Sequence, residues 1–135
     1  MLKDLPHAVK VGITRSITRT FEAYMRDIEW NEQRFDPQVF MQRWRNDIVH
    51  HSSWFHSLDD RLKANTVFHQ ELADKINSVI DKVLSEAPTE EQLAKIKELA
   101  TLHGEKDIPV SCKAEANYHI ERLERLGNMD KTENK

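Results

Sequence analysis

The side chains in this sequence most suited to chemistry are its histidines, three of which stand close together. His50, His51 and His56 surround a short aromatic segment, and His69 follows on the next predicted helix. A helix that holds a metal ion presents ligands three or four positions apart, usually with acidic or histidine partners from a second helix. The spacings here are one and five, and neither H-x-x-x-H nor E-x-x-H occurs. We therefore expect no metal site, and a histidine-ligated metal protein is only the last alternative.

A single cysteine, Cys112, is the other candidate for reactivity. It lies at the N-terminus of a predicted helix, a position where a helix dipole can lower the pKa of a thiol, but no residue near it in the sequence supplies a base. The sequence contains no glycine-rich phosphate loop, paired catalytic carboxylates or nucleophile elbow. We therefore predict a protein that is not an enzyme and that needs no cofactor.

Three arginines lie on one side of the first predicted helix and are suited to binding phosphates. Arg15, Arg19 and Arg26 stand among threonines and a serine, which are residue types that contact nucleic-acid backbones. The solvated face of any helix has a similar composition, and Glu22 lies within the stripe. The formal net charge of -3 argues against strong non-specific binding. The stripe therefore predicts a local nucleic-acid interface and nothing more extensive.

Aromatic residues are concentrated between residues 30 and 55, and some of them do not follow the helical stripes. Trp30 and Trp54 are the two tryptophans outside the apolar faces, and Phe55 is adjacent to the second. Tryptophans of this kind commonly anchor interfaces. The sequence therefore predicts that Trp30, Trp54 and Phe55 contact a protein partner or a second copy of the chain.

These side chains must be positioned by helices, because apolar residues recur at helical spacing along most of the chain and no strand-like alternation competes. Ser57 to Glu86 is the longest such segment, without glycine or proline, although Asn65 and His69 interrupt its apolar seam. Asp36 before Pro37, Thr89 and Ser111 are at positions typical of helix N-caps. Thr89 and Gln92 have the spacing of a capping box, and Gly104 is at a position typical of a helix C-cap. The predicted helices span about 6–34, 37–51, 57–86, 89–104 and 111–127.

The predicted architecture is all-α. Three long helices joined by brief connections favour an up-down-up bundle over residues 1–87. The two short helices predict a C-terminal helical hairpin over 88–127, either packed on the bundle or tethered to it. Residues 128–135 have little to bury, and we predict a disordered tail there.

Composition supports a folded protein. With 32% charged residues the chain is polar, but its regularly spaced apolar residues provide a core that 135 residues are sufficient to bury. The start of the chain lacks the apolar segment of a signal peptide, and no apolar run is long enough to cross a bilayer. We therefore expect a soluble, cytoplasmic protein without membrane contact.

Residues 89–126 follow the pattern T-x-x-Q, I-x-x-L, G, K-x-E-A, I-x-x-L. The matching positions are Thr89, Gln92, Ile96, Leu99, Ala100, Gly104, Lys113-Ala114-Glu115-Ala116, Ile120 and Leu123. This pattern resembles a small two-helix module found at the ends of phage-type recombination and other DNA-metabolism proteins, and in short bacterial proteins. The resemblance implies an accessory role in bacterial or phage DNA transactions.

We therefore expect a small all-α binding protein without chemistry of its own. An accessory protein of DNA transactions is the first interpretation. The alternative is a structural bundle that self-associates, with the apolar seam of residues 57–86 shared between chains.

Overall fold

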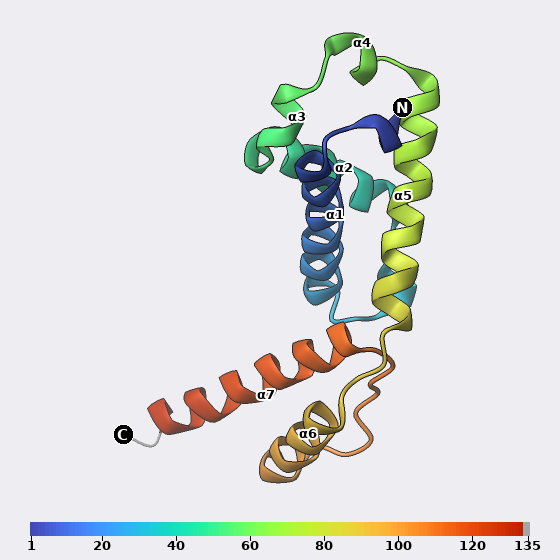
Figure 1. Cartoon of the computed structure of the whole chain (residues 1–135). Coiled ribbons are helices and arrows are strands. Elements are labelled where there is room, and N and C mark those ends of the chain that lie inside the picture. Colours follow the sequence, from blue (N-terminus) through green and yellow to red (C-terminus); the bar gives the residue numbers. More distant parts are fainter. Residues whose placement is uncertain (134–135) are drawn as a thin grey trace. The chain divides into compact units, whose positions relative to one another are not determined.

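The computed structural model describes the backbone of residues 1–133 and the side chains of residues 1–128. Every regular element in that part of the chain is a helix, and no strand occurs there, so the predicted all-α class is confirmed (Figure 1). The elements are η1 (Leu2–Asp4), α1 (His7–Asp27), η2 (Glu32–Arg34), α2 (Pro37–His51), α3 (Ser53–Ser57), α4 (Asp60–Lys63), α5 (Thr66–Ser85), α6 (Glu90–His103) and α7 (Lys113–Glu133).

The chain divides into two compact units. The first unit is Met1–Asp81, and the second begins at Lys82, near the C-terminal end of α5. The assignment of residues 1–87 and 88–127 to separate domains stays a prediction, as does the up-down-up arrangement of the long helices.

The core of the first unit forms where α1 packs against α2 and α3. The apolar stripes predicted for the first two helices are buried there, except that His51, the last member of the second stripe, is exposed. The second helix begins and ends as predicted, because Pro37 takes its first position and Asp36 caps it, accepting a hydrogen bond from the backbone N–H of Gln38 at 2.9 Å. The buried residues of the two stripes are Ile13, Ile17, Phe21, Tyr24, Phe40, Trp44 and Ile48.

The first helix is shorter than predicted, ending at Asp27 and not near Arg34. Glu29 and Trp30 follow with φ of 58° and 55°, in the left-handed region, and this conformation stops the helix. The N–H of Trp30 donates to the carbonyl of Met25 at 2.7 Å. The resulting turn places the indole of Trp30 edge-on to Phe21, with ring centroids 6.2 Å apart.

The prediction of a single long helix over 57–86 is wrong. The chain instead forms α3, α4 and α5, with breaks at Leu58–Asp59 and at Asn65. The side chain of Asp59 accepts the N–H of Arg61 at 2.8 Å, and that of Asn65 accepts the N–H of Val67 at 2.8 Å. Short polar side chains of this type compete with helix continuation by capping a new helix. Apolar periodicity continues on both sides of Asp59 and Asn65, so it did not reveal the caps.

The second unit contains the helix pair α6 and α7, which pack against each other. The predicted capping box is confirmed, since Thr89 Oγ1 accepts the N–H of Gln92 at 3.0 Å and Gln92 Oε1 accepts the N–H of Thr89 at 2.9 Å. Gly104 ends α6 with φ of 71°, a left-handed conformation that glycine adopts without strain. The core of this unit is formed by Ile96, Ala116 and Leu123.

The last helix is longer than predicted. It was expected to end at Gly127, with a disordered tail over 128–135, but α7 continues through Gly127 to Glu133. Residues 134–135 of the predicted tail lie outside the described part of the chain.

The two longest helices, α1 and α7, have 21 residues each, which is the length needed to cross a bilayer. Both carry charged side chains along their length. Within the residues that the structure describes, no helix combines the length and the apolar character of a membrane span.

Candidate functional site

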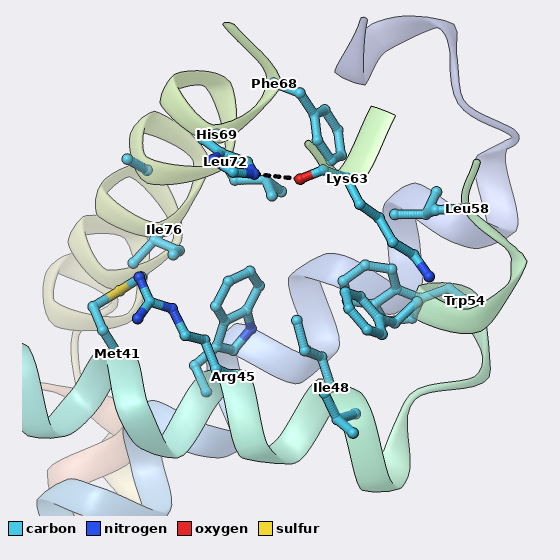
Figure 2. Close-up of a pocket in the computed structure, with 14 residues that line it drawn as sticks. Met41, Arg45, Ile48, Trp54, Leu58, Lys63, Phe68, His69, Leu72 and Ile76 are labelled. Atoms are coloured by element: carbon cyan, nitrogen blue, oxygen red, sulfur yellow. Dashed lines mark hydrogen bonds between the residues drawn. The ribbon is translucent and has the colours of Figure 1, made fainter. Parts of the chain in front are cut away.

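An apolar pocket of about 410 Å³ lies within the first unit (Figure 2). It is bounded by α2 on one side, by α5 on another, and by the segment of α3 and α4 at one end. Apolar pockets of this size with a few polar groups are typical of sites for small molecules. The lining residues are Met41, Trp44, Arg45, Ile48, Val49, Trp54, Phe55, Leu58, Lys63, Phe68, His69, Leu72, Ala73 and Ile76.

The α2 wall of the pocket follows directly from the helical repeat. Met41, Trp44, Arg45 and Ile48 are at positions i, i+3, i+4 and i+7, so they share one face of the helix. The orientation of Trp44 is fixed by α1, because its Nε1–H donates to Oγ of the buried Ser16 at 3.0 Å. Trp44 is therefore held in place as a largely buried part of this wall, with 4% of the residue exposed.

The α5 wall faces α2. Phe68, Leu72 and Ile76 are spaced four residues apart, with Ala73 beside them. From Phe68 to Ile76 the lining face extends for about 12 Å, at 1.5 Å per residue. Leu72 and Ala73 are half-buried, whereas Phe68 and Ile76 are buried. Part of the apolar seam over 57–86, which the alternative interpretation shares between chains, thus lines a pocket inside one unit.

A corner between α4 and α5 closes one end of the pocket. Asn65 caps α5 there, and Nε2–H of His69 donates to the backbone carbonyl of Lys63. The ammonium group of Lys63 lies over the ring of Phe55, 4.4 Å from the centroid. The two polar residues that interrupt the predicted seam therefore build this corner.

Trp54 forms the floor at the same end, and it lies against α1 at Gly12. The indole is only 7% exposed. A Cβ at Gly12 would come within 2.6 Å of Trp54 Cδ1, so only glycine allows this approach. The glycine inside the first predicted helix is therefore required by the position of Trp54.

The charge of the pocket lining is all of one sign. Arg45, Lys63 and His69 are its ionisable side chains, and no acidic side chain is among the described residues that line it. Figure 2 shows Arg45 beside Met41 and Ile76, at the opposite end from Trp54 and Lys63.

The residues predicted to contact a partner occupy different positions. Trp30 is 9% exposed and packs on Phe21, outside the pocket. Trp54 is buried and Phe55 half-buried, and both line the pocket. The sequence thus singled out Trp54 and Phe55 for a partner and His69 for other chemistry, but gave no role to Arg45 or Ala73. The spacing of Met41, Trp44 and Ile48 was the signal available for the α2 wall.

The arginines of the predicted nucleic-acid interface lie together on the outer face of α1. Arg15, Arg19 and Arg26 are exposed and border a shallow surface hollow that also contains Glu22. Arg19 forms a two-pronged ion pair with Asp47 of α2, at 2.6 and 3.2 Å. Part of the positive charge on this face is therefore already neutralised within the protein.

Two of the histidines considered for metal binding are hydrogen-bonded to backbone carbonyls, and the cysteine is buried. Nδ1–H of His50 donates to the carbonyl of Asn46 at 2.9 Å, and Nε2–H of His56 donates to that of Val49 at 2.7 Å. Cys112 is fully buried. No group of three or more candidate metal ligands occurs among the described residues.

A polar cluster in the second unit, built around the buried Glu115 and His119, was not anticipated from the sequence. The N–H and Oγ of Ser111 donate to Glu115 at 2.7 and 2.8 Å, in place of the simple N-cap predicted for Ser111. Arg122 pairs with Glu105 at 2.8 and 3.0 Å and donates to Nδ1 of His119 at 3.2 Å. Burial, reinforced by the Arg122 cation, lowers the pKa of His119, while the bond from Arg122 lowers the pKa of Glu105.

Comparison with known proteins gave no match to a protein-family model, to a curated protein or to a solved structure. The resemblance of residues 89–126 to a two-helix module of DNA-metabolism proteins thus stays a prediction.

Proposed function

We propose that this protein acts by binding a small hydrophobic molecule in the pocket between α2 and α5. The observation that carries the proposal is the size of the pocket, about 410 Å³, together with its largely apolar and aromatic lining. Trp44, Trp54 and Phe68 border the pocket with large rings that the protein itself mostly buries, so they form a firm apolar wall. Burial of apolar ligand surface against such rings contributes about 25 cal/mol per Å² before the costs of association.

A small molecule suits this pocket better than a helix of a partner protein. A partner helix needs a groove that is open along its length, so that anchors at i, i+4 and i+7 enter side by side. Here Trp54, Leu58 and Lys63 close one end (Figure 2). The lining of α5 extends only about 12 Å, which is little more than two helical turns.

Titration with N-phenyl-1-naphthylamine, an uncharged dye that fluoresces in apolar sites, tests this proposal. We expect saturable binding of one dye per chain. Ala73→Phe adds a ring to the pocket wall without removing an existing contact, and it should abolish the binding while the far-ultraviolet circular dichroism is retained. Ala23→Phe, on the exposed surface of α1, is the matched control and should bind normally.

Equal dye binding by the Ala73→Phe and wild-type proteins would show that the dye sits elsewhere and would contradict the proposal. A second copy of the chain is the competing occupant. In that case the chain would dimerise, as measured by light scattering, and the dye signal per chain would fall as protein concentration rises.

A role in bacterial or phage DNA transactions and a cytoplasmic location remain further proposals about where such binding is used. The first depends on the two-helix resemblance of residues 89–126, and the second on a chain with one cysteine. Neither is needed for binding in the pocket.

A further inference from the structure

We infer that the ligand of this pocket is an amphipathic acid, with a hydrophobic chain along the pocket and a carboxylate at Arg45. The inference rests on the proposed function and adds the chemical class of the ligand. Its basis is charge complementarity: the ionisable side chains around the pocket are basic, and none of the described lining residues is acidic. The chain as a whole has a net charge of -3, so this local excess does not reflect overall composition.

Of the three ionisable side chains, Arg45 is the one available to a ligand. His69 is committed to the carbonyl of Lys63. The Lys63 ammonium lies over the Phe55 ring and 3.9 Å from Asp60. Arg45 is exposed, and within the described part of the chain it forms neither an ion pair nor a side-chain hydrogen bond.

Two other arginines of the first unit have carboxylate partners. Arg19 pairs with Asp47, and Arg43 pairs with Asp27 at 2.6 Å. Arg43 also lies over the ring of Tyr24, 4.7 Å from its centroid. Arg45 is on the same helix as Arg43 but turns toward the pocket, where no carboxylate of the lining meets it.

The geometry orients the ligand. Arg45 lies beside Met41 and Ile76 at one end of the pocket, whereas Trp54 and Leu58 lie at the other (Figure 2). The planar guanidinium group matches the two oxygens of a carboxylate, and it can do so while still in contact with water. The hydrocarbon chain would then run from Arg45 past Ile48 and Leu72 toward Trp54.

Displacement of N-phenyl-1-naphthylamine by decanoate and by decanol tests the inference, because the two have equal chain length and differ in the charge of the head group. We expect decanoate to bind the wild-type protein about two- to fivefold more tightly than decanol, the upper part of the range for one partly exposed charge pair. Arg45→Gln should remove that preference, so that decanoate binds no more tightly than decanol. Arg43→Gln makes the same change of charge on the same helix, away from the pocket, and should keep the preference.

Each outcome separates the inference from the proposed function. Equal displacement by decanoate and decanol in the wild-type protein would overturn the carboxylate assignment while leaving the hydrophobic pocket in place. A preference for decanoate that survives in Arg45→Gln would also overturn it. Dye binding that neither compound displaces would exclude a single-chain amphiphile as the ligand, whereas absence of dye binding would instead refute the pocket itself.

Discussion

The indole of Trp54 occupies the space that a side chain at Gly12 would need. Cδ1 of Trp54 lies 2.6 Å from the position of a Cβ on Gly12, well inside van der Waals contact. Gly12 lies in the second turn of α1, inside the helix, where glycine costs up to about 1 kcal/mol relative to alanine. The helix therefore carries a residue unfavourable to its own stability at the point where the floor of the pocket packs against it.

Gly12→Ala should consequently destabilise the protein, although alanine is the better helix former. Overpacking of a buried contact of this kind costs about 1–3 kcal/mol, which exceeds the helix-propensity gain. The free energy of unfolding from urea titration measures the effect. Gly127→Ala is the control, because a Cβ there would meet only His103 at 3.7 Å, an ordinary contact, and it should be neutral or stabilising. A stabilised Gly12→Ala protein would show that Trp54 moves aside easily.

Asn65→Ala should weaken the start of α5. The Asn65 side chain accepts the N–H groups of Val67 and Phe68 at 2.8 and 3.1 Å, and loss of such a cap costs about 1 kcal/mol. Asn65→Asp retains an accepting oxygen and should unfold at nearly the wild-type urea concentration. If the alanine variant matches the wild type, the corner at Asn65 is maintained by other contacts, such as that between His69 and Lys63.

Stability of the second unit should depend on pH through His119. Burial and Arg122 lower the pKa of His119 below its ordinary 6.5, so below that pH the unfolded chain binds a proton that the folded chain does not. The free energy of unfolding should therefore be fully developed above about pH 6.5 and fall as the pH is lowered from there. The pKa of Glu105 is lowered from 4.5, so its contribution is lost only at more acidic pH.

Urea unfolding of the wild-type and His119→Gln proteins between about pH 7.5 and pH 5 tests this dependence, since that range lies above the Glu105 titration. The slope should flatten in His119→Gln and persist in His7→Gln, which changes an exposed histidine of α1. Proton NMR of His119 in the wild type supplies a measurement that does not require the variant to fold. An ordinary or raised pKa there would contradict the prediction.

If α1 binds nucleic acid, removal of the negative charge of Asp47 should change the affinity for DNA. Asp47→Asn releases Arg19 from its ion pair, so binding of a DNA duplex at low salt should strengthen if Arg15, Arg19 and Arg26 contact phosphates. Glu105→Gln removes one negative charge from an ion pair in the second unit and serves as the control. Fluorescence anisotropy measures both. Identical traces for the two variants, or no binding by either, would eliminate this interface.

The sequence was informative where apolar periodicity and capping residues agreed. Asp36-Pro37 located the start of α2, and the Thr89–Gln92 capping box and Gly104 located both ends of α6. Each of these depends on a local hydrogen bond or a local backbone conformation, so a short stretch of residues is sufficient to predict it.

The pocket was not predictable in the same way, because it depends on where helices stop. Asn65 was read as a polar interruption of one helix, whereas it begins another and turns α5 to face α2. Similarly, the left-handed turn at Glu29 and Trp30 involves residues with no preference for that conformation. Tertiary packing decides where these helices end. For the same reason, the sequence showed that Trp30 and Trp54 lie outside the apolar stripes, but it did not show that both are buried.

The distribution of tryptophans also gives the protein an internal optical reporter. Trp44 and Trp54 line the pocket, whereas Trp30 packs on Phe21 outside it. The indole N–H of Trp44 is bonded to Ser16, whereas that of Trp54 has no hydrogen-bond partner among the described residues. A molecule entering the pocket would alter the emission of two indoles and leave the third as a reference, so occupancy can be followed in the unlabelled protein.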